Sequence, residues 1–250
     1  MDHDTAIGGP NQKFPVTSHS AIIAARSAVP EVREGALEAI FASYWKPAYK
    51  YIRIKWQASN EDAKDLTQSF FADAIEKNHF RNYDSEKASF RTFFRICLDR
   101  FVANRLKAEQ RLKRGGGVSH SSLDFAGAEA ELTVEGRKFD SDPEEYFYRE
   151  WVRSLFSLAL DSLYLHFKKS DREICFKLFE LYDLDDQPAA EVSYASLAVE
   201  FGLSLTDVTN YLAAARREFR RIVLEKLREL TASEGEFRNE ARKLMGVEIR

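Results

Sequence analysis

Residues 196–221 read SLAVEFGLSLTDVTNYLAAARREFRR, in which short polar side chains precede a run of arginines. An asparagine can pair with adenine in the major groove of DNA, and a threonine methyl can contact the methyl group of thymine. Arginines that follow directly suit phosphate contacts, which position a protein on the duplex. The candidate DNA-contacting residues are Thr206, Thr209, Asn210, Ala213, Arg216, Arg217 and Arg220.

These side chains can reach base edges only if a helix–turn–helix presents them. Ala198, Gly202 and Val208 are spaced four and six residues apart, as that motif requires. The small residue allows close helix packing, the glycine allows the positive φ of the turn, and the apolar residue anchors the second helix. The spacing therefore predicts a helix–turn–helix over 194–217, in preference to a plain helical hairpin with a solvated basic end.

Apolar residues recur at helical spacing through most of the chain, and no convincing strand pair occurs, so the predicted fold class is all-α. Ser59 with Asp62, Ser170 with Glu173, and Ser204 with Asp207 are spaced like capping boxes that start helices. The predicted organisation is an N-terminal extension over 1–33, a helical domain over 34–114, a long acidic linker over 115–141, a second helical domain over 142–230 and a C-terminal tail over 231–250.

Charge falls into two blocks of opposite sign, although the whole chain carries only −3. Residues 86–114 hold nine Lys/Arg against three Asp/Glu, whereas residues 124–150 hold three against nine. The basic block is interleaved with phenylalanines, a pattern that can hold a nucleic-acid backbone and stack an unpaired base. The alternative is that these phenylalanines form core and the charges form a solvated face.

Other functional classes are disfavoured by what the sequence lacks. It has no apolar run of transmembrane length and no apolar signal-peptide segment, so we expect a globular cytoplasmic protein that does not enter membranes. Cys97 and Cys175 lie in apolar helical patterns and are expected to be reduced thiols. The five histidines have no ligand spacing. We therefore expect no metal, no other cofactor and no enzymatic activity.

Three stretches carry a resemblance to a known family. SNEDAKDLTQSFFADAIEK (59–77) and DSEKASFRTFFRICLDRFVANRLKAEQRLKRGGG (84–117) resemble region 2 of bacterial sigma-70-type factors of the extracytoplasmic-function class. SYASLAVEFGLSLTDVTNYLAAARREFRRIV resembles region 4 of the same family, and the KRGGG run looks like a subtype with an extended linker. The resemblance spans roughly residues 34–230, and EDAKDLTQSFF is its most specific string. It implies a sigma factor, which selects promoters for RNA polymerase without catalysis of its own.

The resemblance also implies roles for individual residues. The helix that begins near residue 60 would dock on the clamp helices of the largest core polymerase subunit, through Asp62, Asp65, Leu66, Gln68 and Phe71. The basic helix would melt and hold the −10 promoter element through Phe90, Arg91, Phe94, Arg100, Asn104, Arg105, Lys107 and Arg111. The helix–turn–helix would read the −35 element, the polymerase flap would be a second docking site, and an anti-sigma factor would be a further candidate partner. The acidic segment 124–150 would run through a positively charged channel of the polymerase.

Two alternatives stay open at this point. The first is a stand-alone helix–turn–helix regulator that binds an operator without core polymerase, with 34–114 as a sensor or dimerisation domain. The second is an all-α enzyme, for which Asp183, Asp185 and Asp186 resemble a cation-binding loop; however, the glycine and terminal glutamate of a calcium hand are missing.

Overall fold

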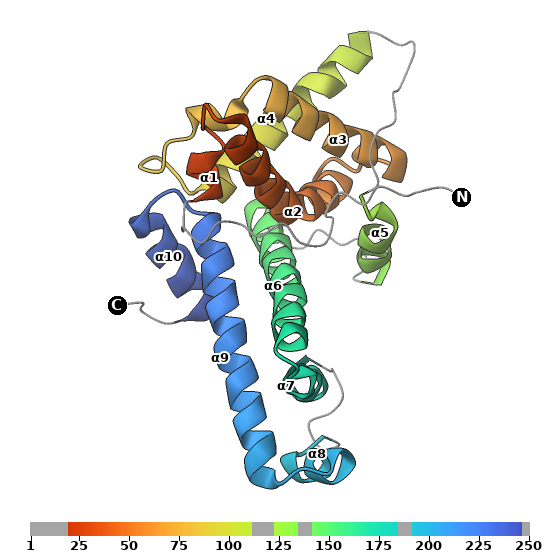
Figure 1. Ribbon diagram of the computed structural model, residues 1–250. Helices are drawn as coiled ribbons and strands as arrows, with labels where there is room; N and C mark the ends of the chain where they lie inside the picture. The colour runs from red at the N-terminus through yellow and green to blue at the C-terminus, as the bar shows by residue number, and fades with distance from the viewer. Residues whose placement is uncertain (1–19, 112–122, 135–141, 185–191, 247–250) are drawn as a thin grey trace, which may run out of the picture. The chain divides into compact units, whose positions relative to one another are not determined.

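The structure, a computed structural model, is helical throughout its described part (Figure 1). It describes residues 20–111, 123–134, 142–184 and 192–246. No strand occurs in these ranges, which confirms the predicted all-α class. Within the same ranges, no helix combines the length and the apolar composition needed to cross a membrane.

The chain divides into two compact units. The first comprises Met1–Ser154 and Leu227–Arg250, and the second comprises Leu155–Lys226. The first unit contains α1 (Ala21–Ala24), α2 (Pro30–Lys55), α3 (Asn60–Glu76), the 3-10 helix η1 (His79–Asn82), α4 (Phe90–Arg111), α5 (Phe125–Val134) and α10 (Glu234–Met245). The second contains α7 (Glu173–Phe179), the π-helix η2 (Glu180–Leu184) and α8 (Tyr194–Phe201). Helices α6 (Pro143–Lys169) and α9 (Leu205–Glu229) contribute residues to both units.

An aromatic cluster forms the centre of the first unit. The Tyr44 ring lies 4.5 Å from the Phe94 ring and 5.6 Å from the Phe90 ring, and Phe94 lies 5.2 Å from Phe70. Phe147 of α6 joins the cluster at 6.1 Å from Phe94. All five side chains are fully buried or nearly so. Large aromatic side chains bury the most area per residue, so this cluster fixes how α2, α3, α4 and the start of α6 pack.

Local capping signals set several helix starts. The Ser59 hydroxyl accepts a hydrogen bond from the Asp62 N–H at 3.1 Å, as its spacing predicts. The predicted box at Ser170 and Glu173 is wrong. The Ser170 hydroxyl instead donates to the carbonyl of His166 at 3.0 Å, and Arg172, which makes no side-chain cap, precedes α7. The Ser170 hydroxyl therefore bonds to the last carbonyls of α6 instead of capping the start of α7, because one hydroxyl cannot serve both helix ends.

The segment 115–141, which the sequence predicts to be a linker, contains helix α5. Glu131 of α5 forms ion pairs with Lys46 and Lys50 of α2, and Glu129 pairs with Arg53 of the same helix at 2.5 Å. The hydrogen bonds of Glu131 to these lysines outweigh its burial and hold the pKa of its carboxyl below the usual range. Glu129 and Glu131 are therefore neutralised inside the first unit, whereas Glu135 and Asp140 lie outside the described residues. The prediction that the segment 124–150 runs through a polymerase channel remains a prediction.

A buried ion pair joins α2 to α6. Lys50 Nζ lies 2.7 Å from Glu150, and the two side chains are only 1% and 3% exposed. Burial alone would lower the pKa of Lys50, but its hydrogen bonds with Glu131 and Glu150 raise that pKa above its ordinary range. Lys50 is therefore charged in the folded state, and it holds α5 and α6 on the same helix.

The predicted C-terminal tail, 231–250, contains α10, which packs in the first unit. The Glu236 carboxylate accepts hydrogen bonds from the N–H groups of Phe90, at 2.6 Å, and Ala232, at 2.8 Å. Glu240 forms an ion pair with Arg91 at 2.5 Å. Because Phe90 begins α4, Glu236 supplies an acceptor and a negative charge to the first turn of that helix. Residues 231–246 of the predicted tail are thus a structural part of the first unit.

We predict that Lys50→Met lowers the free energy of unfolding by about 3 kcal/mol, because the buried Glu150 then keeps only its ion pair with the 55% exposed Arg153. Adding Glu150→Gln should recover part of this loss, since the incompletely compensated buried charge is then removed. Urea unfolding followed by circular dichroism measures both effects. The matched control is Lys64→Met, whose pair with the 79% exposed Glu61 is expected to contribute less than about 1 kcal/mol. Equal losses for the two lysine variants would contradict the buried pair.

Candidate nucleic-acid interface

In the second unit, α8 and α9 meet as the predicted helix–turn–helix. Gly202 ends α8 with φ +63°, in the left-handed region that favours glycine. Leu203 N–H then donates to the Ala198 carbonyl at 2.9 Å, which closes the turn. Ala198 is 8% exposed and Val208 is fully buried. The small residue, the glycine and the apolar anchor thus occupy the environments that their spacing predicts.

The second helix of this motif starts at the predicted capping box. The Asp207 N–H donates to the Ser204 hydroxyl at 3.0 Å, and the Ser204 N–H donates back to the Asp207 carboxylate at 3.2 Å. Both orphan donors at this end of α9 are therefore satisfied without help from other elements. The acid in this box also lies favourably at the positive end of the helix dipole.

The outward side of α9 carries the predicted base-contacting residues. Thr206, Thr209 and Asn210 are exposed, whereas Ala213 is half-buried. The Thr209 hydroxyl donates to the Leu205 carbonyl at 2.8 Å, so the methyl is the group that Thr209 offers to a ligand. We call Thr206, Thr209, Asn210 and Ala213 the recognition face. This face combines an amide, a hydroxyl and three methyl groups, which are groups that can distinguish base edges in a major groove.

The arginines after this face differ in what they contact. Arg217 and Arg220 are exposed and form no ion pair within the described residues. Arg216 is held in a bidentate pair by Asp183, with Nε–Oδ2 at 2.9 Å and Nη2–Oδ1 at 2.8 Å. Its Nη1 also donates to the Tyr194 hydroxyl at 3.1 Å. In the folded chain, the Arg216 guanidinium ties α9 to η2 and α8, so a phosphate contact would have to compete with Asp183; the predicted contact remains a prediction. Asp183 is an ion-pair partner, and Asp185 and Asp186 lie outside the described residues.

In the first unit, three of the predicted −10 residues are inside the structure. Phe90 and Phe94 are fully buried in the aromatic cluster. Arg91 is 7% exposed, pairs with Glu240 and lies over the ring of Tyr148 at 4.4 Å. These three predictions are corrected, because core packing and an internal carboxylate already occupy the groups that would contact a base or phosphate.

Three of the five remaining −10 candidates line a cavity of about 550 Å³. Arg100, Asn104 and Arg105 of α4 line it, together with the half-buried rings of Phe93 and Phe101. The other lining residues are Asp73, Lys77, His79, Asn82 and Cys97. Lys107 is exposed outside this lining, and the side chain of Arg111 lies outside the described residues. Two aromatic rings, two amides and two guanidinium groups could stack a base, hydrogen-bond its edge and hold its phosphates.

The predicted −10 site does not include Phe93 and Phe101, although the helical spacing of the phenylalanines contains the information needed to separate them from Phe90 and Phe94. Phe90, Phe94 and Leu98 recur every four residues and are all fully buried. Phe93 and Phe101 are eight residues apart on the neighbouring face of the same helix. Because i, i+4 positions share a face, the two sets of phenylalanines must point in different directions. The choice between them depends on which face meets the core.

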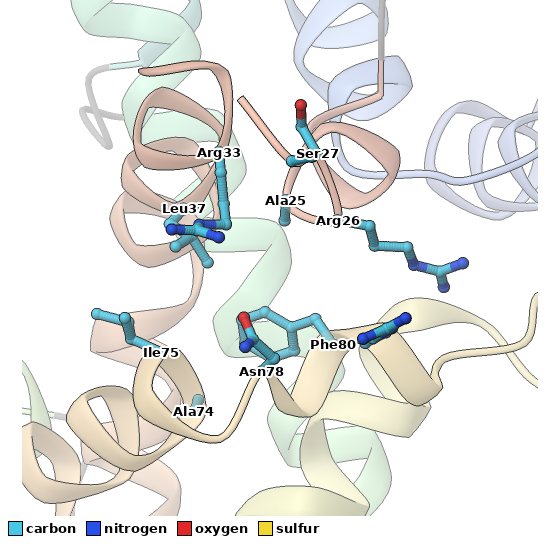
Figure 2. Close-up of a pocket in the computed structure, with 11 residues that line it drawn as sticks. Ala25, Arg26, Ser27, Arg33, Leu37, Ala74, Ile75, Asn78 and Phe80 are labelled. Atoms are coloured by element: carbon cyan, nitrogen blue, oxygen red, sulfur yellow. The ribbon is translucent and has the colours of Figure 1, made fainter. Parts of the chain in front are cut away.

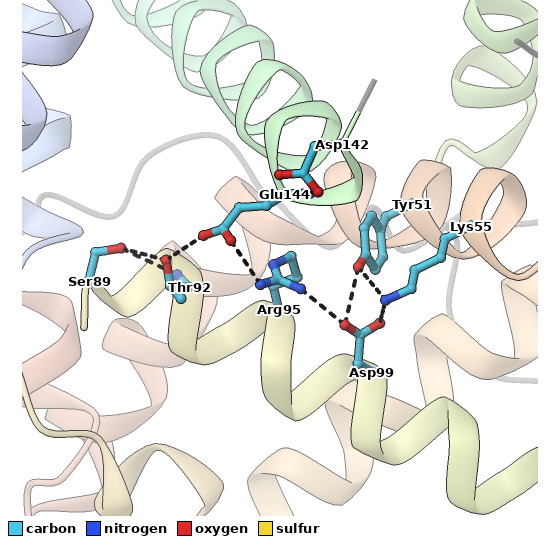
Figure 3. A network of polar contacts seen from close by, with 8 residues as sticks. All are labelled: Tyr51, Lys55, Ser89, Thr92, Arg95, Asp99, Asp142 and Glu144. Atoms are coloured by element: carbon cyan, nitrogen blue, oxygen red, sulfur yellow. Dashed lines mark hydrogen bonds and ion pairs between the residues drawn. The ribbon is translucent and has the colours of Figure 1, made fainter. Parts of the chain in front are cut away.

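A polar network holds the middle of α4 in place (Figure 3). Asp99 accepts from Lys55 at 2.8 Å and from Tyr51 and Arg95 at 3.2 Å each. Arg95 also pairs with Glu144 of α6 at 3.2 Å. Burial would lower the pKa of Lys55, but its hydrogen bonds with Asp99 and Tyr51 raise it. The network ties α4 to α2 and α6 within the first unit, on side chains that are not among those lining the cavity.

The five predicted polymerase-contacting residues of α3 divide by exposure. Asp62 and Asp65 are exposed, and Gln68 is half-buried. Leu66 and Phe71 are only 6% and 7% exposed, and the Phe71 ring contacts Phe41 at 4.6 Å. Leu66 and Phe71 are therefore corrected to core residues, whereas the two carboxylates remain available at the surface.

No protein-family model matches the chain, and neither a curated protein sequence nor a solved structure matches it significantly. The sigma-factor resemblance thus stands on the quoted sequence strings. Within the described ranges, no group of three or more His, Cys, Asp or Glu residues could hold a metal ion. Cys97 is half-buried and Cys175 is buried, and both are free thiols.

We predict that Arg216→Ala and Asp183→Ala each destabilise the protein by about 0.5–1 kcal/mol, and that their effects are not additive. The reason is that each variant removes the same bidentate pair. A double-mutant cycle from urea unfolding measures the coupling. Arg217→Ala is the matched control, because its side chain makes no ion pair in the described part of the chain. A coupling energy near zero would show that Arg216 does not depend on Asp183.

Proposed function

We propose that this protein is a sigma factor that binds core RNA polymerase and directs it to promoters. The observation that carries the proposal is the exposed recognition face on a fully formed helix–turn–helix, with Arg217 and Arg220 available beside it. In the proposed assignment, the recognition face reads the −35 element as duplex. Arg217 and Arg220 position α9 by contacts to the backbone phosphates.

The cavity on α4 supports a second contact, with the melted −10 element. Phe93 and Phe101 would stack an extruded base, Asn104 would hydrogen-bond its edge, and Arg100 and Arg105 would hold flanking phosphates. Extruding a base costs a few kcal/mol, and stacking on aromatic side chains offsets about 1–3 kcal/mol per base. The chain thus has a cavity on α4 suited to single-stranded DNA and a recognition face on α9 suited to duplex DNA. This combination favours a promoter-melting factor over a protein that reads only double-stranded DNA.

The exposed carboxylates Asp62 and Asp65 support the proposed docking of α3 on the polymerase clamp helices. Carboxylates at the rim of an interface contribute mainly to orientation and association rate. The proposed contact involves fewer residues than the resemblance alone implies, because Leu66 and Phe71 belong to the core of the first unit.

A stand-alone operator-binding regulator is the second candidate. The burial of Phe90, Arg91 and Phe94 favours it, since the resemblance assigns these side chains to DNA. In that case, the first unit would serve sensing or dimerisation, and the helix–turn–helix would bind DNA unaided.

A gel-shift assay with and without core polymerase separates the two candidates. Promoter fragments selected from a random library by the reconstituted holoenzyme would serve as the DNA. We expect a specific complex and run-off transcripts with core polymerase, and little binding by the protein alone. Arg217→Ala/Arg220→Ala should weaken the complex on every promoter fragment, because two phosphate contacts are lost. Equal and specific binding without core polymerase would replace the sigma-factor proposal with the regulator.

We further predict that Asn210→Ala relaxes discrimination at one base pair of the −35 element by about 1–3 kcal/mol. Arg217→Ala should instead weaken binding to all sequences alike and reduce the salt dependence of binding by about one phosphate contact. Competition binding of holoenzyme to a set of single-base promoter variants, at several salt concentrations, measures both. Identical losses on every promoter for both variants would contradict the assigned roles.

A further inference from the structure

The first unit has a separate cavity, and none of its lining residues is among those assigned to DNA or polymerase. It has a volume of about 270 Å³ and lies between the turn after α1, the start of α2, the end of α3 and η1 (Figure 2). Leu37, Ala74, Ile75 and Phe80 supply its apolar lining, and Ser27 and Asn78 supply polar groups. Phe80 and Ala74 are nearly fully buried, so this lining is continuous with the core.

The charge of this cavity is entirely positive. Arg26, Arg33 and Arg81 line it, and none of the described residues that line it is acidic. Arg26 donates to the Tyr83 carbonyl, whereas Arg33 and Arg81 have no described hydrogen-bond or ion-pair partner. The Asp84 carboxylate interacts with Arg26, but Arg33 and Arg81 lie beside an apolar pocket that has no acidic lining residue. An anionic group that enters could therefore pair with these two guanidinium groups.

Exposed aliphatic side chains occur on the same segments that line the cavity. Ile23, Val29, Val32 and Ile75 are between 45% and 51% exposed, and they are the large apolar residues of the first unit's described part that are most exposed. Ile75 lines the cavity itself, and the other three lie within two residues of a lining residue. Apolar exposure in this unit is thus concentrated on the segments that line one cationic pocket, and such a concentration typically marks an interaction site.

We propose that this cavity is a docking site for a peptide segment of a partner protein, in which one or two carboxylates stand beside aliphatic or aromatic side chains. The carboxylates would pair with Arg33 and Arg81, and the apolar side chains would cover Ile75 and Val32. A small inorganic anion would leave the exposed aliphatic side chains uncovered. An anionic membrane would be repelled by Glu31, Glu34 and Glu76, which are exposed on the same elements, whereas a peptide can place its neutral or basic groups there.

Fluorescence anisotropy with the full-length protein tests this proposal. The probe is a labelled synthetic peptide that contains Glu and Leu in equal numbers. We expect it to bind, and we expect Arg33→Gln/Arg81→Gln to weaken binding by roughly tenfold or more. Ile75→Ser should also weaken binding, because it removes an apolar contact of the cavity. Both variants change partly exposed side chains, and an unchanged urea midpoint would verify that they fold.

The matched control is Arg217→Gln/Arg220→Gln, which removes the same charge from the second unit. It should leave peptide binding unchanged while weakening promoter binding. Arg33→Gln/Arg81→Gln should weaken peptide binding and leave promoter binding unchanged, so this proposal and the proposed function can fail separately. The proposal is overturned if a peptide with Gln in place of Glu binds equally well, if a peptide with Ser in place of Leu does so, or if no peptide binds. It is also overturned if inorganic phosphate alone, or vesicles of phosphatidylglycerol, bind in an Arg33- and Arg81-dependent manner while the peptide does not.

Discussion

The packing of the first unit depends on the burial of one positive charge. Lys50 lies in the middle of α2 with its side chain 1% exposed, so its ammonium group needs carboxylates within hydrogen-bond distance. Glu131 of α5 and Glu150 of α6 meet this need. An apolar residue at position 50 would not require α5 and α6 to bring carboxylates next to it. The charge therefore contributes specificity of packing more than net stability, because desolvation offsets much of the attraction in a buried pair.

This requirement changes the meaning of the acidic block that the sequence shows so clearly. Nine acidic residues between 124 and 150 suggest a segment of mutually repelling charges that stays solvated. Their basic partners on α2 cannot be recognised from the sequence, because they lie far away along the chain. In the folded chain, Glu129, Glu131 and Glu150 meet Arg53, Lys46 and Lys50, which lie about 80–100 residues earlier. Composition could thus predict the charge of this block but not its neutralisation, because ion pairs of that sequence separation depend on the tertiary fold.

Signals that act within a few residues were predictable from the sequence. The Ser204–Asp207 box, the left-handed Gly202 and the burial of Val208 all depend on neighbours in the same helix or turn, and each has the predicted conformation or burial. The direction of the α4 phenylalanines was not predictable in this way. Helical spacing separates Phe90 and Phe94 from Phe93 and Phe101, but only the packing of Tyr44 and Phe147 against one set identifies the core face. The Ser170 error has a similar origin, because one hydroxyl lies between two helix ends.

The number of α9 arginines without an ion-pair partner affects how strongly this helix can bind DNA by itself. Of the four arginines that follow the recognition face, Arg216 is held by Asp183, and Arg221 pairs with Glu218 and Glu225. Arg217 and Arg220 are left for phosphates among these four. Most of the sequence-independent affinity for DNA comes from phosphate neutralisation, so these two contacts of α9 supply only a small part of it at physiological salt. The recognition face could still distinguish bases, but a larger partner would have to supply the affinity. If the recognition face supplies specificity and core polymerase supplies most of the affinity, a polymerase subunit fits these contacts better than a regulator that binds an operator alone. Such a regulator would need more phosphate contacts or a second copy of α9 on the same DNA.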